Sequence, residues 1–309
     1  MDVFFTIIVN VIFPVFALIA AGLVAHRRFH FDIGTLSKLT TYVLLPTVSF
    51  ANIYESKVQW SLLLGVVGYL ILLSISLIAI ATVVSNIARF DKKHAAVFKN
   101  SVVLINSGNF GLPVSQLVFH DNPIGLSVQV VISVYQNMLT YSYGMMNSVS
   151  AMHEKSWKTV MEFLKIPTLY AVLLGLMMNT FAIRIPSFVW NPIDNVSDAF
   201  LAIALFTLGA QSAYLKINEI PLVLILSVLG RLIVSPVVSL LLILYLGLNG
   251  VIAQALFIAS SFPTSRNASL LALEYDNHPE HAAKSVILTT MLSSITVSIV
   301  VYLSQILFH

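Results

Sequence analysis

The chain has 309 residues, of which 58% are hydrophobic and only 9% are charged, so it is far more apolar than an ordinary soluble domain. The net charge of +3 resides in short turns between long apolar runs, which favours a role in membrane orientation over contact with nucleic acid. Because no cysteine is present, disulfides, thiolate catalysis and cysteine-based metal sites are excluded.

Ten apolar runs are predicted to be transmembrane helices, because each is close to the roughly 20 residues that cross a hydrocarbon core about 30 Å thick. Their expected ranges are 3–24, 36–53, 62–84, 95–119, 124–147, 166–183, 193–214, 220–246, 251–273 and 282–308. The first run has Asp2 before it and His26, Arg27 and Arg28 after it. A secretory signal has the opposite charge order, so this span is expected to remain in the mature protein.

The basic residues fall mainly on one side of the membrane if the N-terminus is placed outside. The inner loops then receive Arg27, Arg28, Lys38, Arg89, Lys92, Lys93, Lys99, Lys155, Lys158, Lys165, Lys216 and Lys284. Only Lys57 and Arg184 fall outside, while Arg231 and Arg266 lie within spans. This asymmetry follows the positive-inside rule and predicts a multi-pass protein of the cell membrane with both termini extracytoplasmic.

The two halves of the chain share weak but collinear sequence matches. They pair Pro14 and Gly22 with Pro167 and Gly175, residues 68–71 with 230–233, and residues 127–128 with 285–286. Because each half holds five spans, the second half must enter the membrane inverted, which is a transporter architecture. The predicted organisation is a five-helix repeat over 1–147, a short cytoplasmic linker over 148–165 and an inverted five-helix repeat over 166–309.

The fourth span contains the sequence NSGNFGLP at residues 106–113, near the middle of the membrane. Pro113 lacks an amide hydrogen and disfavours the α conformation at Leu112, while Gly108 and Gly111 allow backbone shapes that other residues resist. We therefore expect an unwound segment here. Such a break alone is also compatible with a structural kink.

The ninth span has a corresponding interruption that contains Pro263, Ser265, Arg266 and Asn267. Matching breaks in the two halves indicate a transporter's binding site. A half-helix that restarts at this depth directs its amides and the positive end of its dipole at the membrane centre, which favours an anion. Arg266 adds a positive charge, and no Asp or Glu occupies the centre of any span, so an anionic solute is the expected counter-ion.

Other polar residues within spans have two interpretations each. Arg231 lies near the midplane and either contacts the solute or donates to backbone carbonyls at a helix interface. Gln136 and Asn137 are predicted near the site, whereas polar residues such as Asn10 and Gln129 usually bond between helices. His278 and His281 flank a Pro-Glu pair in the last inner loop, where a solvated loop is favoured over a metal site. No metal or cofactor is expected.

Spans 4 and 9 resemble those of the auxin efflux carrier family, which includes bacterial malate and malonate permeases and the plant PIN proteins. NSGNFGLP is similar to the family's Asn-(Thr/Ser)-Gly-x-x-Gly-x-Pro pattern, so Asn106, Gly108, Gly111 and Pro113 carry over as site residues. In span 9 the family pattern of a proline followed by Asn-Ala is matched by Pro263, Asn267 and Ala268. Arg266 does not belong to that pattern.

The resemblance covers essentially the whole chain and implies a fold in which spans 4 and 9 cross at their prolines. It also implies a scaffold of spans 1, 2, 6 and 7, a moving transport domain of the other six, and dimers in some members. PIN proteins carry a long hydrophilic loop between the halves, whereas only residues 148–165 separate them here, so regulation through such a loop is not expected.

The hypothesis from the sequence is an elevator-type, alternating-access transporter of a small organic anion, either a dicarboxylate such as malate or malonate or an auxin-like monocarboxylate. Asn106, Asn109, Arg266 and Asn267 are expected to hold the anion. No mid-membrane carboxylate is available for ion coupling, which favours uniport or electrogenic export, while sodium binding by backbone carbonyls stays open as an alternative. An intramembrane enzyme is not expected, because its motifs are missing. A membrane sensor that binds the anion without moving it stays open as the alternative.

Overall fold

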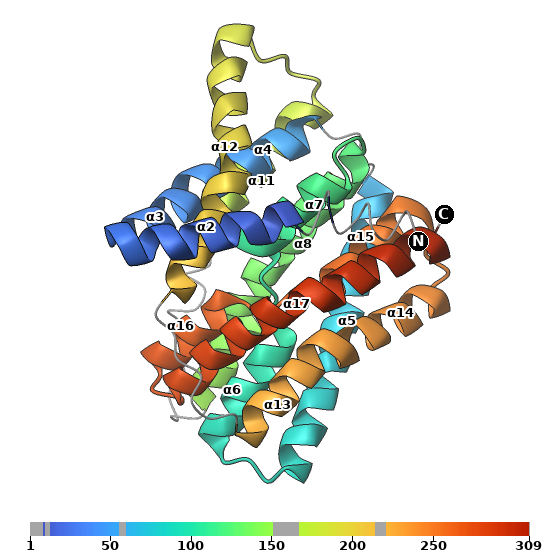
Figure 1. Ribbon diagram of the computed structural model, residues 1–309. Coiled ribbons are helices and arrows are strands. Elements are labelled where there is room, and N and C mark those ends of the chain that lie inside the picture. The colour runs from blue at the N-terminus through green and yellow to red at the C-terminus, as the bar shows by residue number, and fades with distance from the viewer. Residues whose placement is uncertain (1–8, 10–12, 56–59, 151–166, 214–220, 309) are drawn as a thin grey trace. The chain divides into compact units, whose positions relative to one another are not determined.

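The computed structural model describes residues 9, 13–55, 60–150, 167–213 and 221–308 (Figure 1). Within these ranges the chain forms helices and connecting segments, and no strand is present. Ile105 and Thr264 form an isolated antiparallel bridge. The predicted all-α class is confirmed for this part of the chain.

The helices follow the expected apolar runs. Those of the N-terminal half are α2 (Phe13–Phe29), α3 (Ile33–Leu39), α4 (Leu45–Glu55), α5 (Trp60–Ile87), α6 (Lys92–Val103), α7 (Leu112–Val118), α8 (Pro123–Leu139) and α9 (Met145–Ser150). Those of the C-terminal half are α11 (Pro167–Thr180), α12 (Ser187–Ser212), α13 (Leu222–Leu229), α14 (Ser235–Tyr245), α15 (Gly250–Ser260), α16 (Arg266–Glu274) and α17 (Pro279–Leu307). Most of the linker expected at 148–165 lies outside the described residues.

Short π-helical turns interrupt or extend several of these helices. They cover Thr40–Leu44, Ser107–Gly111, Thr140–Gly144 and Gly230–Val234. The first joins α3 to α4, the third joins α8 to α9, and the fourth joins α13 to α14. Turns of this kind occur often at functional sites, and the second of them contains part of the motif predicted in span 4.

Four helical segments in the described part of the chain are long and apolar enough to cross a membrane. They are Leu64–Ile87, Ser187–Ala210, Leu222–Tyr245 and Pro279–Leu307. The helices of spans 4 and 9 are divided into shorter pieces, so neither can meet such a length criterion as one helix. That all ten segments cross the membrane, in two inverted repeats, stays a prediction.

The chain divides into two compact units that each draw on both halves of the sequence. Unit 1 comprises Met1–Leu63, Gly108–Val134 and Leu164–Tyr214, and unit 2 comprises Leu64–Ser107, Tyr135–Phe163 and Leu215–His309. The ranges expected for spans 1, 2, 6 and 7 thus fall in unit 1. Unit 1 also contains Gly108–Val134, which the family resemblance assigned to the other group.

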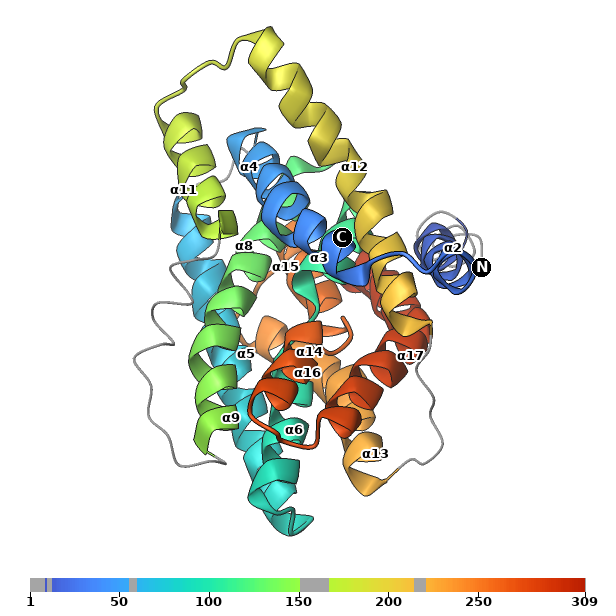
Figure 2. The same ribbon diagram turned by 90° about the vertical axis from the view of Figure 1, so that its left-hand side faces the viewer.

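Unit 1 is organised around two helix pairs, α2 with α12 and α4 with α11 (Figure 2). The α2–α12 pair is so close that a Cβ atom on Gly22 would lie 2.0 Å from the carbonyl oxygen of Phe206. A Cβ atom on Gly209 would likewise lie 1.8 Å from the carbonyl oxygen of Ile19. Only glycine allows this approach of two backbones, and Arg27 extends the contact by donating from Nε to the carbonyl of Ala213 at 2.9 Å.

Unit 2 is built around α17, which contacts α6, α13, α15 and α16. The buried side chains of its core include Phe98, Phe257 and Phe262. Buried hydroxyl groups on α17, including those of Thr289 and Thr290, donate to backbone carbonyls one turn earlier in the same helix. Asn106 and Pro263, one from each helix interruption that the sequence singled out, both lie in this unit.

Candidate functional site

Helix α6 ends before the glycine-rich motif of span 4. At its start, Asp91 Oδ1 accepts a hydrogen bond from the backbone N–H of His94 at 2.8 Å, which caps the helix. The helix ends at Val103, and Leu104 is extended with φ −89° and ψ 119°. The interruption therefore covers Leu104–Asn106, earlier than the sequence predicted.

The predicted unwinding across residues 106–113 is wrong in its extent. Ser107–Gly111 forms a π-helical turn, and Gly111 has an ordinary helical φ of −68°. Pro113 lies in the first turn of α7, where a missing backbone N–H costs no hydrogen bond. The motif therefore restarts a helix in unit 1, whereas the extended segment precedes it.

The break in span 9 lies between α15 and α16. Helix α15 ends at Ser260, and Ser265 caps α16 with its hydroxyl oxygen, which accepts from the backbone N–H of Asn267 at 3.2 Å. Arg266 is the first residue of α16. The sequence placed Arg266 and Asn267 within the break, but both belong to the first turn of the restarted helix.

The two interruptions pair with each other in an antiparallel arrangement. The backbone N–H of Asn106 donates to the carbonyl of Pro263 at 2.9 Å, and the N–H of Ser265 donates to the carbonyl of Leu104 at 2.8 Å. These bonds flank the Ile105–Thr264 bridge. We refer to Leu104–Asn106 and Pro263–Ser265 as the crossing. All its residues are buried, and the pairing satisfies backbone groups that would otherwise be buried without hydrogen-bond partners.

Side chains from two further helices satisfy the outward backbone groups of the crossing. Gln136 Oε1, on α8, accepts from the N–H of Ile105 at 3.3 Å. Thr289 Oγ1, on α17, accepts from the N–H of Thr264 at 3.1 Å. The sequence predicted Gln136 near this site, but it gave no reason to distinguish Thr289 from the other hydroxyl residues of span 10.

Asn106 leaves one polar group of the crossing unused. Its side chain is 6% exposed, and its Nδ2 atom is buried without a hydrogen-bond partner among the described residues. A buried donor of this kind costs about 1–3 kcal/mol. The crossing therefore presents an amide N–H that an acceptor such as a carboxylate oxygen would satisfy.

Arg231 is fully buried and binds the carboxyl ends of both interrupted helices. Its Nη1 donates to the carbonyl of Val102 at 2.6 Å, near the end of α6. Its Nη2 donates to the carbonyl of Ser260, the last residue of α15, and to the hydroxyl of Ser235. A cation at two helix carboxyl termini is favourable. Of the two predicted roles of Arg231, these contacts match donation to backbone carbonyls at a helix interface.

The structure changes the prediction that the buried cations near the crossing need an anionic counter-ion. The ion pairs of the described ranges join Lys93 to Asp276, His94 to Asp91 and His120 to Asp121, and none of these lies at the crossing. Because carbonyl oxygens face the guanidinium of Arg231, its charge no longer requires an anionic solute. Arg266 is half-buried in the first turn of α16, directly after the crossing.

The other predicted site residues are distributed over both units. Asn137 is half-buried on α8 in unit 2. Gly108, Asn109, Gly111 and Pro113 belong to unit 1, in the π-helical turn and the start of α7. Asn10 lies outside the described residues. Asn106, Pro263, Ser265 and Gln136 thus take part in the hydrogen bonds of the crossing, whereas Arg231 binds the two helix ends that precede it.

Comparison with known proteins gives two matches. The sequence profile of a family described as membrane transport protein matches residues 7–301 and so includes both helix breaks. An uncharacterized transporter of Methanocaldococcus jannaschii, MJ1031, is 22% identical over 272 residues, which cover 85% of this chain and 87% of the relative.

Proposed function

The chain belongs to the membrane transport protein family, and from this premise we propose that it carries a small organic anion across the cell membrane by alternating access. The apolar helices and the family agree on a multi-pass membrane protein. The proposed substrate is a dicarboxylate such as malate or malonate, or an auxin-like monocarboxylate. The crossing is the proposed centre of the binding site.

The buried amide of Asn106 is the observation that carries the proposal. It is an unused donor on one of two paired helix interruptions, and a carboxylate would supply the acceptor. Arg266 and the first amides of α16 follow directly after the other interruption, where a positive helix end favours an anion. The contributions of Gly108, Asn109, Gly111 and Pro113 rest on the sequence pattern alone.

The proposal includes ten spans in two inverted repeats, 1–147 and 166–309. Two pairs of observations support it. The predicted equivalents Gly22 and Gly175 each approach a backbone carbonyl, of Phe206 and Phe50 respectively. In the crossing, Gln136 of span 5 and Thr289 of span 10 accept from the two residues of the central bridge. Contacts made by corresponding spans of opposite halves are expected from a duplicated, inverted architecture.

In the proposed mechanism, unit 2 is the moving transport domain and unit 1 the scaffold of an elevator-type carrier. Unit 2 contains the whole crossing and Arg266, so Asn106 and Arg266 can move together with the anion. The remaining predicted site residues Gly108, Asn109, Gly111 and Pro113 lie in unit 1. We propose uniport or electrogenic export, because the sequence places no Asp or Glu at the centre of any predicted span. Both termini are proposed to be extracytoplasmic.

Uptake of radiolabelled malate and malonate into proteoliposomes, with and without imposed ion gradients, tests the proposal. Saturable flux of a carboxylate is expected from the wild type. Asn106→Ala should reduce the rate about tenfold or more, because a hydrogen bond to a charged group contributes about 1.5–3 kcal/mol. Asn195→Ala is the matched control, since Asn195 is exposed on α12, and it should retain wild-type flux.

The outcome distinguishes the carrier from the alternative sensor. Binding of a carboxylate without saturable flux would favour a sensor. If no tested carboxylate is bound or transported, the proposal that the substrate is an organic anion is refuted. Wild-type flux in the Asn106→Ala variant would show that this amide does not hold the solute.

A further inference from the structure

Three histidines outside the crossing meet at the other end of α6, in unit 2. His94 lies in the first turn of α6, while His278 and His281 lie at the start of α17. One potential ligand atom from each of the three lies within 4.8 Å of the others. The rings of His94 and His278 are stacked with centroids 3.8 Å apart. The sequence drew attention only to the second and third of these residues.

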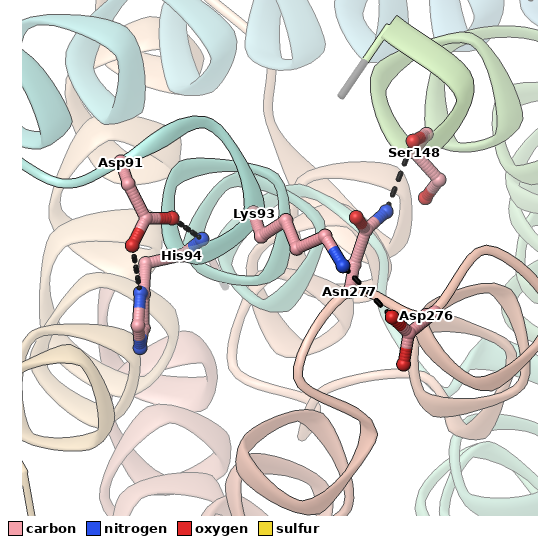
Figure 3. Close-up of polar contacts among 6 residues, drawn as sticks. All are labelled: Asp91, Lys93, His94, Ser148, Asp276 and Asn277. Carbon is pink, nitrogen blue, oxygen red and sulfur yellow. Dashed lines mark hydrogen bonds and ion pairs between the residues drawn. The ribbon is translucent and has the colours of Figure 1, made fainter. Parts of the chain in front are cut away.

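His94 is held in a fixed orientation by Asp91. The carboxylate receives the backbone N–H of His94 on one oxygen and contacts the ring Nδ1 with the other at 2.7 Å (Figure 3). This carboxylate contact fixes the ring orientation and leaves Nε2 as the available ligand atom. Metal-binding histidines characteristically have such a carboxylate behind them, which also increases the basicity of the ligand.

The turn that carries His278 is held in place at several points. Lys93 Nζ contacts Asp276 Oδ2 at 2.8 Å, and Asn277 Nδ2 donates to the carbonyl of Ser148 at 2.9 Å (Figure 3). His278 itself has a left-handed backbone with φ 45°, a conformation uncommon outside glycine. Its ring is therefore positioned beside His94 by the fold of the turn.

The remaining features also suit a metal ligand set. His281 Nδ1 is buried and has no hydrogen-bond partner in the described part of the chain. His278 and His281 also line a surface pocket of about 310 Å³, which leaves room for water as a fourth ligand.

We propose that His94, His278 and His281 form a binding site for a divalent transition metal ion, with Zn²⁺ as the best fit, and that Asp91 positions His94 for it. Three imidazoles and a water complete a tetrahedral Zn²⁺ site with Zn–N distances of about 2.0–2.1 Å. Ligand nitrogens are then about 3.4 Å apart, so the present separation of at most 4.8 Å closes through side-chain rotation. The ion would join α6 to the turn before α17 and stabilise unit 2.

Isothermal titration of the purified full-length protein with ZnCl₂ tests the site, with a histidine-free affinity tag. We expect one ion per chain and a rise in apparent Tm of about 5 °C or more at a hundredfold excess over Kd. Co²⁺ should produce the visible absorption of a tetrahedral nitrogen site, and Mg²⁺, which prefers oxygen ligands, should have no effect. Absence of saturable Zn²⁺ binding below about 1 mM overturns the proposal.

Variants assign the ligands. Replacement of His94, His278 or His281 by Ala should each abolish the single Zn²⁺ site, and the Gln variants serve the same test where an Ala variant does not fold. Asp91→Asn retains a good helix cap but should weaken binding about 10 to 100-fold. His120→Ala is the control, because His120 lies outside the cluster, and it should bind like the wild type. Equal binding by the His94 variant would refute the site, whether or not the protein transports an anion.

Discussion

The role assigned to Arg231 depends on which residues surround it in the structure. A lone cation within an apolar span suggested contact with the solute as one of two roles. The structure places its guanidinium on the carbonyls of Val102 and Ser260, which end two interrupted helices. An arginine fork can serve two acceptors at once, which a lysine ammonium does less well. The sequence could not choose between these roles, because Val102 is 129 residues from Arg231.

Arg231→Met should reduce stability by about 2–5 kcal/mol, because it leaves buried carbonyl groups without their donor. The apparent Tm in detergent measures this, with Arg231→Lys expected between the wild type and Arg231→Met. Arg184→Met is the control and should fall within about 0.5 kcal/mol of the wild type, since Arg184 is exposed. An unchanged Tm together with a raised KM for uptake would instead make Arg231 a substrate contact.

At the scale of helices, the sequence predicted which spans are broken better than where each break lies. Pro263 marks the break of span 9 directly, because proline cannot continue the backbone hydrogen bonding of α15. In span 4 the extended residues are Leu104–Asn106, of which Leu104 and Ile105 have side chains compatible with a helix. Their conformation is explained by long-range pairing with Pro263 and Ser265, and no local pattern encodes such a pairing.

The close contact between α2 and α12 allows a sharp test with two glycines. Gly209→Ala should destabilise the protein by about 1–3 kcal/mol, because the added methyl group would overlap the carbonyl oxygen of Ile19. Gly68→Ala, also within a helix, has no atom within 4 Å of the new Cβ position and should stabilise by about 0.5–1 kcal/mol. Thermal melting compares the two variants. Equal Tm values would contradict the described contact.

For the whole molecule, the described helices lie largely within the predicted apolar runs, but these runs did not reveal the division into units. Gly108–Val134 belongs to unit 1, whereas the preceding Leu64–Ser107 belongs to unit 2. This division depends on contacts between distant segments, such as Gly22 with Phe206, and no local pattern of hydrophobicity encodes such contacts. The proximity of His94 to His278 and His281 could likewise not be predicted from the sequence, because it depends on contacts between distant segments.

The predicted orientation can be tested with introduced cysteines, because the chain contains none of its own. Lys92→Cys lies in a predicted inner loop and Asn249→Cys in a predicted outer loop. A membrane-impermeant maleimide added to intact cells should label only the Asn249 variant, and both variants should react after the cells are opened. Labelling of the Lys92 variant in intact cells would reverse the proposed topology.

The Arg27–Ala213 hydrogen bond joins residues 186 positions apart, and this separation has a consequence for biosynthesis. At roughly 5–20 residues per second on the ribosome, the partner of α2 is completed about 10 to 40 s after α2 itself. During that interval Gly22 has no helix against which to pack. The newly inserted first helix must therefore wait in the lipid, or be shielded by the insertion machinery, until α12 arrives.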